Sequence, residues 1–352
     1  MDEKHVLITG GAGYIGSMLT GKLLQRGYRV TVLDDLLWGG EALLPYFTHP
    51  SFRFAKVNVT EPDAARPFFD GVDAVIHLAA IVGFPACQQV GPKVARLYNT
   101  EATRYMYDFA NKVGAKRFVF SSTYSNYGIA ANSDPVDETS ALNPQSLYAE
   151  TKIEAEQHLL AQGVGAPCAP VILRFATLFG VSPRTRFDLI INQFVLEAMT
   201  KGELIIYQRG YHRSFVHVSD TVEGIILALE ADREKVTCEI FNLGSERGNM
   251  SKDQIVEAVA RIVPRVAVQY KDLSFGGDMR DIRVRFDKIR SVLGFEPKVT
   301  VEQGIHEVHD AIRLGLIQDP LSPKYRTRPS SCSSAADLVE ASAGDVAGAF
   351  CV

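Results

Sequence analysis

The amino-acid sequence predicts an α/β protein with a doubly wound parallel sheet, followed by a smaller α/β lobe. Short apolar runs rich in Val and Ile are nearly continuous, as strands are when helices cover both faces of a parallel sheet. These runs alternate with longer segments whose apolar residues recur at helical spacing. A glycine-rich turn also follows the first run, where a strand would meet a helix.

The first domain is predicted to span residues 1–180. Its strands are expected at residues 5–10, 29–34, 52–59, 73–80, 117–122 and 169–180. Helices are expected at 15–27 and 98–114, and each ends at a glycine, Gly27 or Gly114, as helices often do.

A second lobe is predicted over residues 181–328, where clear strand-helix units are fewer. It contains two amphipathic patterns, "SKDQIVEAVARIV" at 251–263 and "TVEQGIHEVHDAIRLG" at 300–315. From 329 to 352 the chain is rich in Ser, Ala and Gly and has few large residues. Such a segment buries too little apolar area to offset its ordering entropy, so we predict a disordered tail.

Composition and charge favour small molecules as partners. A net charge of -4 and a pI near 6.1 provide no basic footprint for nucleic acid or for a membrane surface. No apolar stretch is long enough to span a bilayer. The five cysteines lack metal-site spacing and the density of a disulfide scaffold, which favours reduced thiols, no metal site and a cytoplasmic location.

The glycine-rich turn is typical of dinucleotide sites. In "TGGAGYIG", residues 9–16, Gly10, Gly13 and Gly16 would allow a tight turn and close approach of a pyrophosphate to a helix N-terminus. Asp34 ends the second strand 18 residues after Gly16, where a carboxylate can accept from ribose hydroxyls. Because an acid would repel the extra phosphate of NADP, we expect a Rossmann-type domain that binds NAD. The alternative is a purely structural turn.

A tyrosine and a lysine four residues apart form the candidate catalytic pair. "NPQSLYAETKIEAEQHLL" predicts a helix from about Pro144, which places Tyr148 and Lys152 on one face. A phenol with its pKa of about 10 becomes a useful base only beside a cation, and Lys152 supplies one. An isolated pair of this kind is more often a surface feature. The hydroxyl-rich "FSSTYSNYG" at 120–128, shortly before it, favours the catalytic interpretation.

These motifs, in this order, resemble the extended short-chain dehydrogenase/reductase family. The resemblance is to its nucleotide-sugar epimerase and dehydratase branch, closest to UDP-glucose 4-epimerase-like proteins, and it covers about residues 4–315. Besides the motifs above, it rests on "HLAA", "YNTEAT", "LRFATLFG", "RSFVHVSD", "FNLGS" and "LGFEPKVTVEQGI".

The resemblance implies a role for particular residues. Tyr148 would be the catalytic acid/base, Lys152 would tune it and bind the nicotinamide ribose, and Thr123 would bond the sugar oxygen. The expected NAD-binding residues are Gly10, Gly13, Tyr14, Ile15, Gly16, Asp34, Asn58, Val59, Leu78, Ala79, Ala80, Asn99, Tyr148 and Lys152. The expected substrate-binding residues are Thr123, Tyr124, Thr177, Arg186, Arg213 and Arg280. His77 and His217 are expected to serve packing, and helices near 93–113 and 145–162 to form a homodimer.

The residues after Thr123 bear on the reaction. Family 4,6-dehydratases have an Asp-Glu pair there and decarboxylases a glutamate at the second position, whereas this chain has Tyr124 and Ser125. The resemblance therefore favours 4-epimerisation of a nucleotide sugar through a 4-keto sugar. A 4-ketoreductase, a 3,5-type epimerase and a decarboxylase remain alternatives, as does an NAD-binding sensor without catalysis. Asn58 replaces an aspartate that meets adenine, and its amide oxygen would accept from the adenine amino group.

Overall fold

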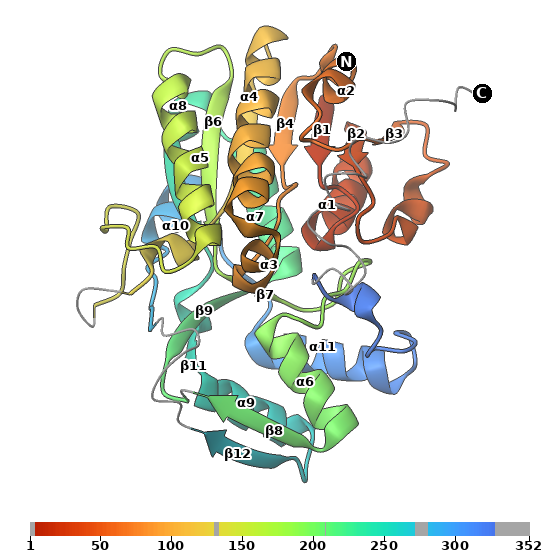
Figure 1. The fold of residues 1–352 in the computed structure, drawn as a ribbon, viewed down its shortest axis with the longest axis vertical. Coiled ribbons are helices and arrows are strands. Elements are labelled where there is room, and N and C mark those ends of the chain that lie inside the picture. Colours follow the sequence, from red (N-terminus) through yellow and green to blue (C-terminus); the bar gives the residue numbers. More distant parts are fainter. Residues whose placement is uncertain (1–3, 130–133, 208, 272–280, 328–352) are drawn as a thin grey trace.

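The computed structural model describes residues 4–129, 134–207, 209–271 and 281–327. The predicted tail and Arg280 lie outside these ranges. Figure 1 shows a layered upper domain and a smaller lobe beneath it.

A seven-stranded parallel sheet forms the upper domain, in the order β10-β6-β5-β4-β1-β2-β3. Its strands are β1 (His5–Thr9), β2 (Arg29–Asp34), β3 (Phe52–Lys56), β4 (Ala74–His77), β5 (Arg117–Thr123), β6 (Ala169–Phe175) and β10 (Glu239–Leu243). This confirms the predicted doubly wound α/β class. The sequence order reverses between β1 and β4, and crevices at such points bind ligands in open α/β sheets.

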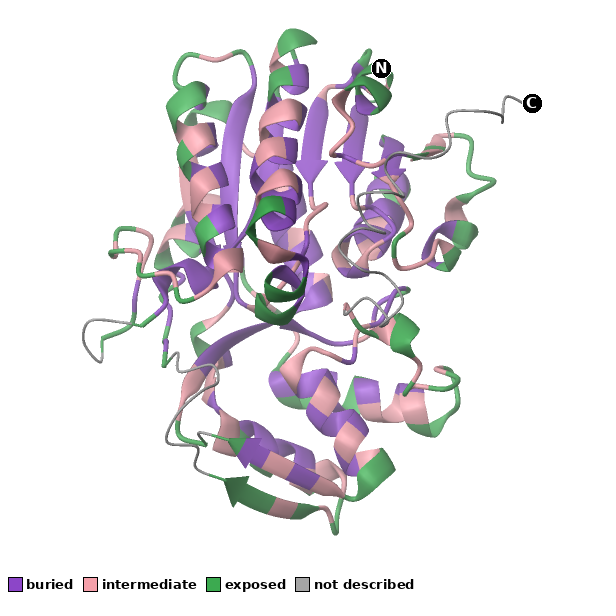
Figure 2. Ribbon diagram, viewed as in Figure 1, coloured by how far each residue is buried: buried purple, intermediate pink, exposed green. Residues whose placement is uncertain are grey.

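Helices cover both faces of this sheet. Alternate residues of β1 point to opposite faces, so Val6 and Ile8 enter one buried core and Leu7 the other. The first core is covered by α1 (Tyr14–Gln25) and α7 (Val218–Glu230), and the second by α3 (Phe84–Arg96), α4 (Ala102–Lys112) and α5 (Leu147–Gly163). Figure 2 shows the central strands as almost wholly buried, which explains their continuous apolar sequences.

The helix that carries Tyr148 and Lys152, α5, begins slightly later than the predicted start near Pro144. Ser146 is the N-cap of α5, and its hydroxyl accepts from the backbone N–H of Ala149 at 3.2 Å. A serine at this position satisfies one of the N–H groups that the first helical turn leaves without a partner. Short helices α2 (Pro62–Ala65), α8 (Arg233–Val236) and α10 (Asp287–Leu293) complete the upper domain.

The smaller lobe has its own core. It contains β7 (Thr177–Phe179), β8 (Glu203–Tyr207), β9 (His212–His217), β11 (Asn249–Ser251), β12 (Ala267–Lys271), α6 (Ile190–Lys201), α9 (Lys252–Ile262) and α11 (Val301–Arg313). α9 and α11 are the two predicted amphipathic helices, each begun by a capping box. In Figure 1 the arrowheads of β1 and β4 point towards this lobe, so the carboxyl ends of the sheet face it.

The predicted boundary at residue 180 does not separate the two parts completely. After β9 the chain returns to the upper domain, where α7 packs beside α1 and β10 pairs with β6. Phe241 and Leu243 of β10 are buried in the same core as Val171 and Leu173 of β6. The predicted strand at 169–180 is also divided, since β6 belongs to the large sheet and β7 to the lobe. Both features depend on partners distant in sequence.

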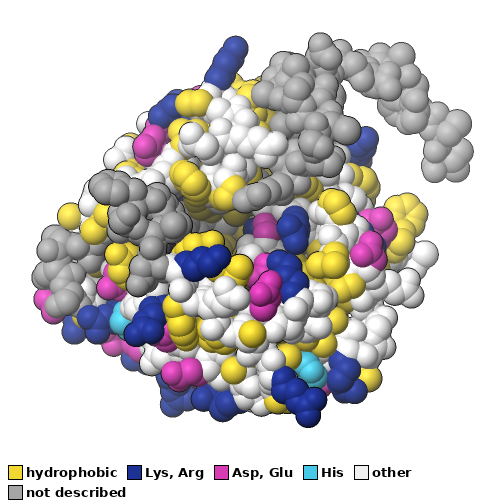
Figure 3. Space-filling view, turned by 60° about the horizontal axis from the view of Figure 1, so that its bottom comes forward, with side chains coloured by type: hydrophobic (Ala, Val, Ile, Leu, Met, Phe, Trp, Pro, Cys, Tyr) yellow, Lys and Arg dark blue, Asp and Glu magenta, His cyan; other side chains and the backbone are white. Residues whose placement is uncertain are grey.

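The surface charges, the helix lengths and the possible metal ligands bear on the sequence predictions. On the face that Figure 3 turns forward, basic and acidic side chains are interspersed rather than gathered by sign. No helix in the described ranges has the length and apolar character needed to cross a bilayer. Within the same ranges, no cluster of His, Cys, Asp or Glu has the arrangement of a metal site.

Candidate active site

A cavity of about 680 Å³ lies at the carboxyl ends of the large sheet, against the smaller lobe. It brings together most of the residues predicted for cofactor and substrate. Those that line it are Gly10, Gly13, Tyr14, Ile15, Gly16, Asp34, Val59, Leu78, Ala79, Ala80, Thr123, Tyr124, Tyr148, Lys152, Thr177, Arg186 and Arg213. Its mixture of apolar and polar lining residues and its position fit a ligand site of an open α/β sheet.

The glycine turn leaves no space for side chains. Gly10 has φ +73°, and a Cβ there would lie 2.7 Å from the backbone nitrogen of Ala79. A Cβ on Gly16 would lie 2.3 Å from the carbonyl oxygen of Gly10. The N-cap of α1 is Gly13, which provides no side-chain cap. The positive end of α1 is therefore open to a phosphate group, as a dinucleotide requires.

Asp34 lies beside this turn at the end of β2. Its carboxylate accepts from the backbone N–H of Ala12 at 2.9 Å and from that of Leu36 at 2.8 Å. Burial raises the pKa of Asp34 to about 6. A carboxylate held in this way retains acceptor capacity for ribose hydroxyls, so the turn and Asp34 together fit NAD.

Two predicted cofactor residues do not line the cavity. The amide oxygen of Asn58 accepts from the backbone N–H of Thr60 at 3.0 Å and from its hydroxyl at 2.8 Å, while its amide nitrogen donates to Tyr98. The structure thus directs that oxygen into a local turn rather than towards an adenine, and adenine recognition by Asn58 is not supported. Val59, the next residue, does line the cavity.

Asn99 is the second predicted cofactor residue that does not line the cavity, and it contacts Ile81 in the cavity wall. Its oxygen accepts from the N–H of Ile81 at 2.8 Å, and its nitrogen donates to the carbonyl of Ile81 at 3.0 Å and to Thr151 at 3.0 Å. It sits in a π-helical turn, Leu97–Glu101, a rare feature that is frequent at functional sites. Asn99 therefore fixes the segment after β4 that forms one cavity wall.

The candidate catalytic residues converge from β5 and α5. Tyr148 and Lys152 lie one turn apart on α5, and Thr123 ends β5. The Lys152 ammonium donates to the carbonyl of Ser121 at 2.8 Å and lies 4.6 Å from the ring centre of Phe120. Burial lowers the pKa of Lys152 to about 8. The structure thus gives a phenol, a hydroxyl and a buried cation in one cavity, as acid/base catalysis needs.

A buried polar network that the sequence did not suggest supports the loop that begins at Thr123. Glu156, one turn after Lys152, accepts from Arg174 at 2.6 and 3.0 Å, and both side chains are almost fully buried. It also accepts from Ser122 at 2.5 Å and from Asn126 at 2.9 Å. Asn126 therefore serves to anchor the loop. The only sequence signal was the four-residue spacing of Lys152 and Glu156 on one helix face.

Tyr124 and Thr177 form a second contact in the cavity wall. Their hydroxyl oxygens lie 2.9 Å apart, and both residues line the cavity. Tyr124 begins a 3-10 turn, Tyr124–Tyr127, after β5, and Thr177 begins β7. The contact joins the end of β5 in the large sheet to β7 in the lobe. It also places the phenol of Tyr124 in the wall of the cavity, where the resemblance predicted that the substrate binds.

The predicted arginines differ in their surroundings. Arg213, on β9, is buried, lines the cavity and donates to the carbonyl of His212 at 2.8 Å. Arg186 forms a two-bond ion pair with Asp188, at 3.0 and 2.9 Å. Although burial opposes it, the charge of Arg186 lowers the pKa of Asp188 to about 2. A third arginine, Arg184, lines the cavity and was not predicted.

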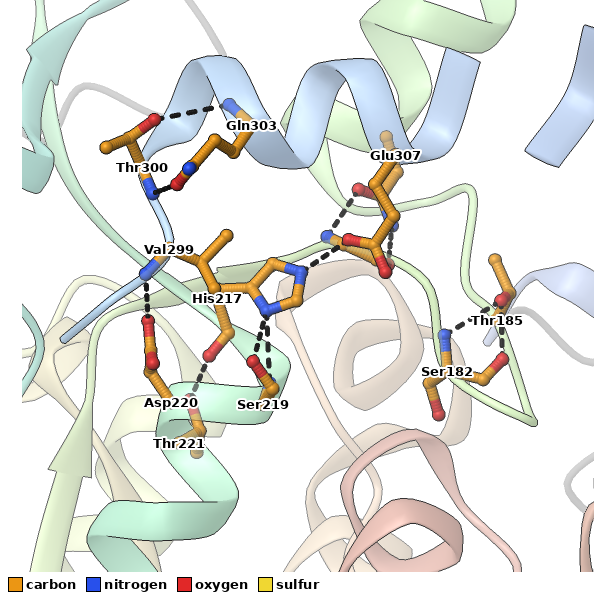
Figure 4. Close-up of polar contacts among 12 residues, drawn as sticks. Ser182, Thr185, His217, Ser219, Asp220, Thr221, Val299, Thr300, Gln303 and Glu307 are labelled. Carbon is orange, nitrogen blue, oxygen red and sulfur yellow. Dashed lines mark hydrogen bonds and ion pairs between the residues drawn. The ribbon is translucent and has the colours of Figure 1, made fainter. Parts of the chain in front are cut away.

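The two histidines hold structure, as expected. His77 is buried between the hydroxyls of Thr9 and Thr103, at 2.7 and 3.1 Å, and burial lowers its pKa to about 3, so it stays neutral. His217 contacts the carboxylate of Glu307 on α11 at 2.6 Å and the hydroxyl of Ser219 at 2.7 Å. Figure 4 shows His217 between these residues. It therefore ties the start of α7 to the lobe.

Comparison with known proteins identifies the family of this chain. Residues 6–244 match the model of the NAD dependent epimerase/dehydratase family. UDP-glucuronic acid decarboxylase 1 of Arabidopsis thaliana is 30% identical over 329 residues, which are 90% of this chain and 71% of that protein.

Two solved structures show the same fold and have similar sequence identity to this chain. The UDP-glucose 4-epimerase of Thermotoga maritima, solved with UDP-glucose, is 27% identical with a TM-score of 0.78, over 89% of this chain and 99% of that one. The dTDP-glucose 4,6-dehydratase of Streptomyces venezuelae, solved with NAD, is 26% identical with a TM-score of 0.78, over 90% and 100%. These three proteins are named for three different reactions. The chain belongs to the NAD-dependent epimerase/dehydratase family of enzymes, and its cofactor is NAD.

Proposed function

We propose that this enzyme is a nucleotide-sugar 4-epimerase. The observation that carries the proposal is the set of acids and bases in the cavity. Tyr148 and Thr123 supply a phenol and a hydroxyl for one sugar oxygen, while Tyr124 and Ser125 follow Thr123 without a carboxylate. Epimerisation needs a single acid/base, whereas water elimination needs a further acid and base.

The carboxylates in the cavity wall are committed to other tasks. Among the described residues that line the cavity, they are Asp34, Asp35 and Asp188. Asp34 and Asp35 each accept from backbone N–H groups in the turn after β2. Asp188 is paired with Arg186 and stays ionised. A dehydratase or a decarboxylase that relies on a glutamate would find no such group beside Thr123.

In this mechanism the chain's residues manage one proton and the position of the sugar. Tyr148 accepts the proton of the C4 hydroxyl, and Thr123 hydrogen-bonds the same oxygen. NAD, when bound, would supply the acceptor and the donor for the C4 hydride. Lys152 favours the phenolate by its charge. After the 4-keto sugar turns within the cavity, Tyr148 returns the proton, so that no cofactor is consumed overall.

The negatively charged diphosphate of the sugar nucleotide requires a positively charged side chain to bind it. Arg213, buried in the cavity wall, is the proposed partner of the diphosphate, because guanidinium groups bind phosphate oxygens with two parallel bonds. Arg186 is a weaker candidate, since Asp188 already neutralises it. UDP or dTDP sugars are proposed as substrates because the related solved enzymes are named for them. A cytoplasmic homodimer through the helix regions 93–113 and 145–162 remains a prediction.

Decarboxylation of a nucleotide-sugar acid is the second candidate. It is favoured by the 30% identity to a UDP-glucuronic acid decarboxylase. Against it stands Ser125 at the position where the resemblance places a glutamate. A 4-ketoreductase would consume reduced cofactor with each turnover, which gives a direct way to recognise it.

Product analysis tests the proposal. The protein with NAD would be incubated in turn with UDP-glucose, UDP-galactose, UDP-glucuronic acid and dTDP-glucose, and the products identified by NMR. A C4 epimer without release of CO₂ and without net change in NADH supports the proposal; CO₂ release or NADH consumption contradicts it. Tyr148→Phe should lower the rate by about a hundredfold or more. Tyr207→Phe, which removes an exposed phenol on β8, is the matched control.

A further inference from the structure

Arg184 carries a buried charge that the described residues do not neutralise. Its side chain lines the cavity, and the residue is only 8% exposed. One terminal nitrogen, Nη2, donates to the carbonyl oxygens of Lys324 and Arg326, at 3.5 and 3.1 Å. Nε is buried and forms no hydrogen bond within the described ranges. The guanidinium carbon lies 5.5 Å from the ring centre of Trp38.

Asp34 and Asp188 lie close enough to affect the pKa of Arg184, but within the described ranges neither forms an ion pair with it. Asp34 accepts from two backbone N–H groups, and Asp188 is paired with Arg186. Burial lowers the pKa of Arg184 to about 10, and the charge of Arg186 adds to this effect. A buried cation without a counter-charge is costly, so the site is suited to receive an anion.

The position of Arg184 identifies that anion. Its loop is fixed against the N-terminus of α1, because the hydroxyl of Ser182 donates to the carbonyl of Tyr14 at 2.6 Å and the phenol of Tyr14 donates to the carbonyl of Gly180 at 2.7 Å. On its other side, Trp38 belongs to the turn that follows Asp34 and also lines the cavity. The loop of Arg184 thus contacts the start of α1, while its guanidinium lies beside Trp38 in the turn that follows Asp34.

We propose that Arg184 binds the phosphate oxygens of the NAD pyrophosphate, opposite the N-terminus of α1. The helix offers backbone N–H groups from the large domain, and Arg184 offers a full positive charge from the loop that leads into the lobe. Because Nη2 also holds the carbonyls of Lys324 and Arg326, the same side chain fastens the segment 323–327 at the cavity wall. Arg184 would serve this role whichever sugar reaction the enzyme performs.

The chain contains its own probe of cofactor binding. Trp38 is the single tryptophan of the sequence and lines the cavity. Its fluorescence, checked by calorimetry, would follow titration of the full-length, nucleotide-free protein with NAD, ADP-ribose and adenosine. ADP-ribose retains both phosphates but lacks nicotinamide, and adenosine lacks phosphate, so the series separates phosphate contacts from all others.

Arg184→Gln should weaken binding of NAD and of ADP-ribose by about ten- to hundredfold, as for a lost charge-assisted hydrogen bond, and leave adenosine unchanged. The matched control is Arg233→Gln, because Arg233 also donates to two backbone carbonyls, at 2.5 and 2.6 Å, but does not line the cavity. Unchanged binding of ADP-ribose by Arg184→Gln would overturn the proposal, and so would an equal loss for adenosine, which indicates general disruption.

A second variant separates phosphate binding from the tether to the C-terminal segment. Tyr325→Ala removes the ring that packs on Phe187, with ring centres 5.6 Å apart, and leaves Arg184 in place. If Arg184 binds phosphate directly, Tyr325→Ala should retain most of the difference in affinity between ADP-ribose and adenosine. If this variant instead reproduces the full loss seen with Arg184→Gln, Arg184 acts only through the segment and the proposal fails. Neither result depends on which sugar is converted.

Discussion

Replacing Glu156 with glutamine tests how α5 supports the loop that begins at Thr123. The carboxylate is 2% exposed and accepts four hydrogen bonds: two from Arg174, one from Ser122 and one from Asn126. Glutamine keeps the shape but removes the charge and presents an NH₂ group to donors. Arg174 would then be a buried cation without a counter-charge.

The cost follows from this burial. Removing one partner of a buried ion pair destabilises a protein by about 3–5 kcal/mol. With an unfolding entropy of about 2.1 cal/mol/K per residue, the 352-residue chain should lose about 4–7 °C in melting temperature. The double variant Glu156→Leu, Arg174→Met removes both charges. Its loss should be well below the sum of the single losses, with Ser122 and Asn126 each costing about 1–3 kcal/mol for a missing acceptor.

Urea unfolding of the single and double variants provides the measurement. Glu154→Gln is the matched control, because Glu154 lies on the same helix and pairs with Arg96, but its side chain is 35% exposed. That change should cost less than about 1 kcal/mol. A loss below about 1 kcal/mol for Glu156→Gln would refute the reasoning. Where the variant folds, its turnover should fall more than its NAD affinity, since Ser122 and Asn126 flank Thr123.

Three further outcomes are expected. Burial lowers the pKa of Lys152 from 10.5 to about 8, so the unfolded chain binds this proton more tightly than the folded chain does. The free energy of unfolding of the NAD-free protein should therefore rise between pH 8 and pH 10.5. Lys152→Met should remove this rise, as urea unfolding at several pH values would show. Gly16→Ala places a methyl group 2.3 Å from the Gly10 carbonyl, so NAD affinity measured by calorimetry should fall at least about tenfold; unchanged affinity would contradict the role of the turn. Tyr124→Phe removes the hydroxyl that contacts Thr177, so the KM for the sugar nucleotide should change while NAD affinity does not, as steady-state kinetics and calorimetry would show.

The sequence by itself determined the fold class, the glycine turn and the position of Tyr148 and Lys152 on one helix face. These features depend on short-range chemistry. Continuous apolar runs indicate strands buried on both faces, a turn without side-chain space requires glycine, and residues four apart on a helix share a face. Asp34, Tyr148 and Lys152 accordingly line the cavity as predicted.

Only the tertiary structure decided which polar groups are already satisfied and which remain open to a ligand. The side chain of Asn58 bonds Thr60 and that of Asn99 bonds Ile81 and Thr151, and neither residue lines the cavity. The return of β10 to the large sheet likewise depends on a partner strand far along the chain. Arg184 became a candidate only once its buried surroundings were known. The physical reason is that the energy of a polar or charged group depends on its partners in space, which sequence spacing alone does not specify.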